Sequence, residues 1–208
     1  MKLRPVVLAA ACAAAIALVL TGCSPKVGTA AKVNQHEISQ DDVNDEVHAL
    51  GLNEAMALGA TSVQEQVAAA RGVVLQFLID EKLFGDVLAR MGVHPDRVML
   101  AEQHDAAIDL LFNGTVPQTG ADADKVLDTA LQQRGIDTDL APTVLRAGEL
   151  QAVLLERTGA SPADLPAAVA KYNPHVDVNP RYGSWDASTL MLVGLSLPSF
   201  LSLSPNIS

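Results

Sequence analysis

The chain has 208 residues, and its 24 acidic residues outnumber its 14 lysines and arginines, which gives a net charge of −10 at pH 7. This acidic balance argues against binding to nucleic acid, which selects basic patches. Only 3% of the residues are aromatic, which also argues against a pocket tailored to a small molecule. A chain of this length can bury one hydrophobic core, so we expect one folded domain.

The first 22 residues have the features of a secretory signal. Lys2 and Arg4 form a short positive region, and residues 6–20 are apolar without a charge. This run of about 15 residues is shorter than the stretch of about 20 that a membrane-spanning helix needs. We therefore expect residues 1–22 to be a signal peptide. The rest of the chain then has a net charge of −12, because 12 basic residues remain against 24 acidic ones.

The apolar run ends in Leu20-Thr21-Gly22-Cys23, which resembles the lipobox of bacterial lipoproteins. The resemblance implies that Cys23 becomes an N-palmitoylated, S-diacylglycerol-bearing N-terminus. It also implies an extracytoplasmic protein that is lipid-anchored to the cell membrane. The alternative is an ordinary signal with a chance cysteine. Since Cys12 lies inside the signal, lipidation of Cys23 leaves no thiol for a disulfide or a metal. Residues 23–30 are predicted to be a tether.

Six helices are predicted between the tether and residue 172. The strongest covers residues 62–91, where Ser62 and Glu65 form a capping box and Gly92 ends the helix. Its apolar residues cover most of its girth, so we expect it at the centre of the domain. Periodicity and stop signals predict the other five helices. One begins after Ser39, and the other four span residues 96–112, 119–134, 139–157 and 161–172.

Two short strands are predicted at the ends of this helical region, near residues 31–38 and 175–180. A lone strand leaves its backbone groups unpaired, so the two strands are expected to pair with each other. The fold class is therefore mainly α, in a domain over residues 31–186 whose ends are joined by strands. Residues 187–208 are rich in Leu and Ser, and we expect an apolar tail there, either packed in a groove or disordered.

Three segments together resemble the N-terminal domain of SurA-type chaperones. They are AKVNQHEIS at 31–39, LIDEKL at 78–83 and VNPRYGSWD at 178–186. The first resembles the opening of the SurA domain, the second the long helix that follows it, and the third the closing segment of SurA-like lipoproteins from Gram-positive bacteria. SurA and PrsA also insert parvulin prolyl-isomerase domains. Residues 114–174 are the only space for such an insert, and they are too short and helical throughout.

The resemblance implies a membrane-anchored chaperone that holds unfolded or nascent exported polypeptides in an apolar groove, without an enzyme's activity and without a cofactor. Two alternatives stay open: a cell-envelope module for one dedicated protein partner, and a peptidyl-prolyl isomerase. The sequence has no phosphate-binding loop, no metalloprotease motif and no nucleophile elbow, and its five histidines lack ligand spacing, so no catalytic or metal site is expected.

The closing segment contains the remaining candidate residues, Arg181, Tyr182 and the sole tryptophan, Trp185. They are expected either to contact a client or to seal the domain, with Trp185 as an anchor against the helices. In the second case Arg181 would cap carbonyl groups or pair with an acid. His104 lies on the apolar face of the predicted helix 96–112, and we expect a hydrogen-bonded core histidine.

Overall fold

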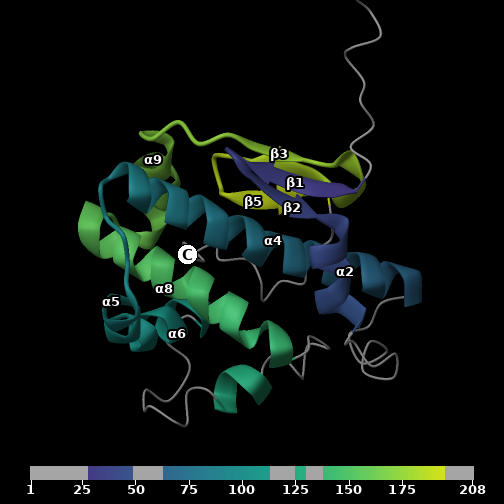
Figure 1. Ribbon diagram of the computed structural model, residues 1–208, viewed down its shortest axis with the longest axis horizontal. Coiled ribbons are helices and arrows are strands. Elements are labelled where there is room, and N and C mark those ends of the chain that lie inside the picture. The colour runs from purple at the N-terminus through teal and green to yellow at the C-terminus, as the bar shows by residue number, and fades with distance from the viewer. Residues whose placement is uncertain (1–27, 49–62, 113–124, 130–137, 195–208) are drawn as a thin grey trace, which may run out of the picture.

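A computed structural model of the chain describes the ranges 28–48, 63–112, 125–129 and 138–194. Cys23, the signal and most of the tether lie outside these residues. The described part is mainly helical with a few short antiparallel strands, as the sequence predicts. Figure 1 shows the helices as one layer, with the strands together on one side of it.

The elements follow one another in a simple order. The helices are α2 (Gln40–His48), α4 (Val63–Arg90), α5 (Arg97–Glu102), α6 (His104–Phe112), α8 (Ala141–Thr158) and α9 (Leu165–Ala170). Short 3-10 turns are η2 (Thr138–Leu140), η3 (Pro162–Asp164) and η4 (Pro180–Tyr182). The strands are β1 (Thr29–Val33), β2 (His36–Ser39), β3 (Val176–Val178), β4 (Ser184–Asp186) and β5 (Met191–Val193).

The long helix α4 is the centre of the domain, as predicted. It packs against α8 and α2 and also against β1, β2 and β5. Its side chains at Leu75, Ile79 and Leu83 share one face and are fully buried, and Leu88, on another side of the helix, is fully buried as well. A helix that is apolar over most of its surface is stable only when other elements cover it. Gly92, at φ 75°, follows the helix end where the chain reverses.

Helix α8 is the second main element and packs against α4, α5 and α6. Gly148 allows the close approach of α6, because a Cβ atom built there would lie 3.1 Å from Ala107 Cβ. The helix predicted over 96–112 is two helices, α5 and α6, with a break at Gln103. The predicted sixth helix starts as the 3-10 turn η3, which Ser161 caps. Of the predicted fourth helix, residues 125–129 are described and helical.

The two ends of the helical region are joined by a three-stranded antiparallel sheet of order β2-β1-β3. The strand predicted near 31–38 is in fact a hairpin, with Asn34 at φ 51° in its turn. Its first strand pairs with β3, for example Lys32 with Asp177, so the predicted pairing of the domain ends is confirmed. β1 also begins at Thr29, and Ala30 is fully buried, so the tether is shorter than predicted.

The C-terminal boundary of the domain lies further along the chain than the predicted residue 186. Met191–Val193 pairs with Ser184–Asp186 in a second, two-stranded sheet. Leu190 and Leu192 are buried in the core, so residues 187–194 belong to the fold and not to a tail. The physical reason is a short apolar alternation that contacts α4. The rest of the predicted tail, 195–208, lies outside the described residues.

Candidate functional site

The predicted residues Arg181, Tyr182 and Trp185 lie in η4 and β4, beside β1 and β3. Tyr182 is buried, and Trp185 is half-buried against the core, so both side chains help to close the domain. Arg181 is exposed. Its Nη1 donates a hydrogen bond to the side-chain carbonyl of Gln40 at 2.9 Å, so this bond goes to a carbonyl group and not to an acid.

Asn179 positions this segment. Its side-chain amide donates to the carbonyl of Thr29 at 2.9 Å, and its side-chain oxygen accepts from the Arg181 backbone N–H at 3.2 Å. Its own backbone N–H donates to the carbonyl of Ala30. The start of η4 is therefore attached to β1, and Arg181 projects from a fixed point of the backbone.

A polar cluster that the sequence did not reveal reinforces the join between the domain ends. Asn34 exchanges two hydrogen bonds with His175: the backbone N–H of Asn34 donates to the carbonyl, and its side-chain oxygen accepts from the N–H. The side-chain amide of Asn34 donates to Asp86 on α4 at 2.6 Å. Asp86 Oδ1 also lies 3.1 Å from His36 Nε2, and Asp86 Oδ2 lies 3.9 Å from Arg90 Nη2. Both partners are exposed, and Asp86 is partly buried.

A second polar cluster lies in the core, and sequence reasoning missed it as well. The Gln76 amide nitrogen donates to Asp80 at 2.9 Å and to the carbonyl of Leu190 at 3.1 Å. Its carbonyl accepts from the Leu192 backbone N–H at 2.8 Å. Gln76 on α4 thus binds the backbone of the β5 segment as a neighbouring strand would.

Asp80 is 2% exposed, and burial raises its pKa from 3.8 to about 8, although the hydrogen bond from Gln76 acts in the opposite direction. A carboxyl group without a cation partner keeps its proton when water is excluded, because the ionised form is the one that burial penalises. Asp80 is therefore neutral at pH 7. Among the described residues, Gln76 is its side-chain hydrogen-bond partner, which suits a structural role better than acid–base catalysis.

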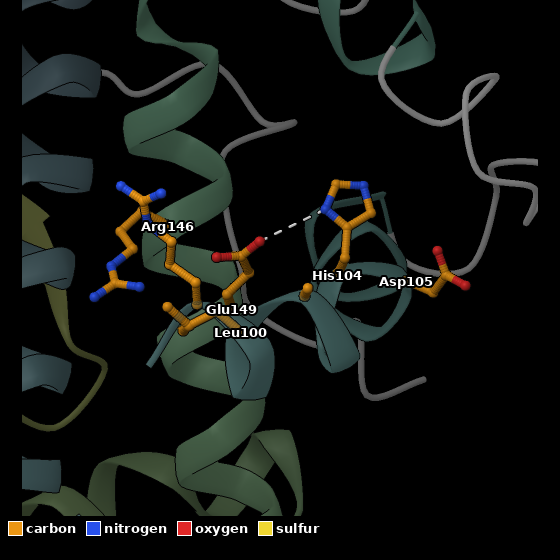
Figure 2. A pocket seen from close by; sticks show the side chains of 7 residues that line it. Leu100, His104, Asp105, Arg146 and Glu149 are labelled. Atoms are coloured by element: carbon orange, nitrogen blue, oxygen red, sulfur yellow. Dashed lines mark ion pairs between the residues drawn. The ribbon is translucent and has the colours of Figure 1, made fainter. Parts of the chain in front are cut away.

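An open recess of about 510 Å³ lies between α5, α6 and α8. Seven residues line it: Arg97, Leu100, Ala101, His104, Asp105, Arg146 and Glu149. In Figure 2 the Glu149 carboxylate points from α8 towards the His104 ring, and Asp105 points away from them. The recess thus combines an apolar floor at Leu100 and Ala101 with charges of both signs around it.

The charged groups of this recess are coupled. His104 Nδ1 lies 3.6 Å from Glu149 Oε1, so this histidine has the polar partner that was expected. Its side chain is 25% exposed, so it lies at the rim of the recess and not inside the core. Partial burial raises the pKa of Glu149, whereas His104 and Arg146 act in the opposite direction. Such an arrangement can bind a polar peptide group, but it holds no nucleophile next to a base.

No group of three or more His, Cys, Asp or Glu side chains with the geometry of a metal site occurs within the described ranges. In the same part of the chain, none of the helices combines the length and apolar character that crossing a membrane requires. No protein-family model, curated protein or solved structure matches this chain.

Proposed function

We propose that this chain is a lipoprotein, anchored through Cys23, whose helical domain binds segments of unfolded or nascent exported polypeptide and thereby acts as a chaperone without catalysis. The observation that carries the proposal is the amphipathic recess along α8. The joined ends of the domain also agree with it, because β1 and β2 contain the first segment that resembles SurA-type chaperones and β3 leads into the third.

The recess suits an extended polypeptide. Its apolar floor can bury a client side chain, which contributes about 25 cal/mol for each Å² removed from water. Arg97 and Arg146, together with Asp105 and Glu149, provide partners for side chains of either sign. Against these gains stands the entropy of ordering the client, so the expected binding is weak and broad.

The test is suppression of aggregation by the mature chain that begins at Ser24, measured by light scattering with several unfolded clients. The variant Ala101→Trp fills the recess, since Ala101 is exposed and lines it. We expect this variant to lose most of the suppression. Ala106→Trp is the matched control, because Ala106 is also exposed but does not line the recess.

Equal suppression of aggregation by the two variants would show that clients bind at a surface other than the recess along α8. If the mature chain suppresses none of several clients, the holdase function is wrong.

A second candidate is a binding module for one dedicated protein partner. It is favoured by the fixed polar groups of the recess, because a few polar groups at set positions around an apolar floor are typical of specific sites. Capture of one stoichiometric partner by the wild type, and its loss in Ala101→Trp, would support this candidate. Many substoichiometric clients would support the chaperone.

A further inference from the structure

A smaller recess lies where α2, α4 and η4 meet. Its volume is about 220 Å³, and its lining residues are Gln40, Asn44, Ala68, Arg71, Arg181 and Tyr182. Two arginines therefore line one small space, and none of these six residues carries a carboxylate. This is a locally basic recess in a chain whose net charge is −10.

Arg71 has a specific need for an acceptor. Its Nε atom is buried and has no hydrogen-bond partner. Arginine stays protonated at any physiological pH, and a buried N–H without an acceptor is unfavourable, the more so on a charged group. Arg71 lines the recess, so an oxyanion bound there would lie beside this guanidinium group and would supply the acceptor after a small movement of the side chain, because the Nε atom itself is closed to solvent. The unsatisfied Nε therefore points to a ligand.

Arg181 is held at the same recess by its neighbours. Its Nη1 donates to the side-chain oxygen of Gln40, and Asn179 fixes the backbone of η4 to β1. One N–H of the guanidinium is used in this way, and the planar group has five. Two guanidinium groups on a rigid frame are well suited to the planar and tetrahedral oxyanions, carboxylate and phosphate.

The position of the recess in the chain favours phosphate over carboxylate as the ligand. The Gly28 carbonyl accepts a hydrogen bond from the Gln40 backbone N–H at 2.6 Å, so the chain enters the domain next to the recess. Gly28 is five residues from Cys23, a stretch that spans at most about 18 Å when extended. With lipid on Cys23, which is part of the proposed function, the recess is within reach of the phospholipid headgroups.

We propose that the recess of Arg71 and Arg181 binds the phosphate group of a membrane phospholipid. A recess of about 220 Å³ is large enough to hold a phosphate while the rest of the headgroup stays outside. Binding there fixes the orientation of the domain on the membrane. Figure 1 shows α5 and α6 at the end of the helical layer away from α2, so the recess along α8 stays open to a client.

The experiment follows the Arg71 Nε–Hε signal by NMR in two settings. In the first, the mature chain without lipid is titrated with inorganic phosphate. In the second, the full lipidated chain is placed in phosphatidylcholine nanodiscs without free phosphate. We expect the same signal to shift in both. In Arg181→Gln the phosphate dissociation constant should rise about tenfold or more, because one of the two guanidinium partners is lost.

Arg157→Gln is the control, because it makes the same charge change at an exposed position on α8. It should bind phosphate as the wild type does. Absence of a shift with phosphate, or equal loss in the two variants, would overturn the site. A shift with phosphate but none in nanodiscs that mass spectrometry shows to contain lipidated protein would overturn the headgroup assignment. Arg181→Gln leaves the recess along α8 intact. Suppression of aggregation by this variant therefore tests the chaperone function independently of the phosphate site.

Discussion

Asp80 and Asp86 lie on the same helix, less than two turns apart, and they illustrate how surroundings decide what a carboxyl group does. Asp80 is in the core, keeps its proton at pH 7 and is held by Gln76, which also binds the β5 segment. Asp86 is at the surface between Asn34, His36 and Arg90. The first supports Gln76, which joins α4 to the C-terminal strands, and the second joins α4 to the hairpin at the N-terminus.

The difference predicts that pH changes the contribution of Asp80 to stability and that salt changes the contribution of Asp86. No cationic side chain in the described part of the chain pairs with Asp80, so its ionisation opposes folding. The contacts of Asp86 are partly solvated ion pairs, which are weak and are screened by salt. The following variants separate these two contributions, in order of decreasing expected effect.

The largest effect is expected from Asp80 on the pH dependence of stability. Its folded pKa, about 8, is above the unfolded value of 3.8, so the folded state binds the proton more tightly. Stability from this group is complete below about pH 4 and decreases by about 1.4 kcal/mol for each pH unit up to about pH 8. Asp80→Asn keeps the acceptor and cannot ionise. It should be more stable than the wild type at pH 7, and the difference should vanish near pH 4.

Urea unfolding of the wild type and of Asp80→Asn between pH 4 and pH 8 measures this difference in stability. The contributions of the titratable groups that the two proteins share cancel in the comparison. Parallel curves for the two proteins would mean that Asp80 is already ionised in the folded state, contrary to the expected effect of its burial.

The next effect concerns Gln76, whose removal leaves several buried groups without partners. Gln76→Ala deprives the Leu190 carbonyl, the Leu192 N–H and Asp80 of hydrogen bonds. We expect the free energy of unfolding to fall by about 3 kcal/mol or more, at roughly 1–3 kcal/mol for each buried unsatisfied group. Amide hydrogen exchange should show that Leu192 loses its protection.

Gln103→Ala is the matched control, because the side chain of Gln103 bonds to Glu156 and this bond is exposed. It should change stability by about 0.5 kcal/mol or less. Similar losses in the two variants would show that the β5 segment does not depend on Gln76.

The smallest effect is expected at Asp86. Asp86→Asn removes the ion pairs to His36 and Arg90 but keeps an oxygen that can accept from Asn34. Because these pairs are near the surface, the loss should be about 1 kcal/mol or less and should shrink at high salt. Asp105→Asn, at an exposed position of α6, is the comparison for the change of charge alone. A salt-independent loss would contradict a screened ion pair.

The helices were predictable because their signals are local. Glycine stops and the wide apolar surface of residues 62–91 do not depend on distant contacts. The pairing of the domain ends was also predictable, since two lone strands need partners. The break at Gln103 was missed, because the residues on both sides of it continue the helical pattern.

The polar sites were not predictable in the same way. Asp80 is part of the run LIDEKL, which reads as the charged side of a helix. The available signal was its position, one turn after Gln76 and one turn before Phe84, which is buried. The recess along α8 and the pair of Arg71 and Arg181 depend on how separate elements pack, and neither leaves a spacing in the sequence.

The central place of β1 in its sheet has a consequence for the order of folding. β2 forms its hairpin with β1 as soon as both have emerged, but β3 is about 140 residues further along the chain. A chain that is synthesised from its N-terminus therefore presents an open strand edge until its last third is complete. Such distant pairings are slow to form, and unpaired edges attract other chains. During its own biogenesis, this protein would be a candidate client for the chaperones around it.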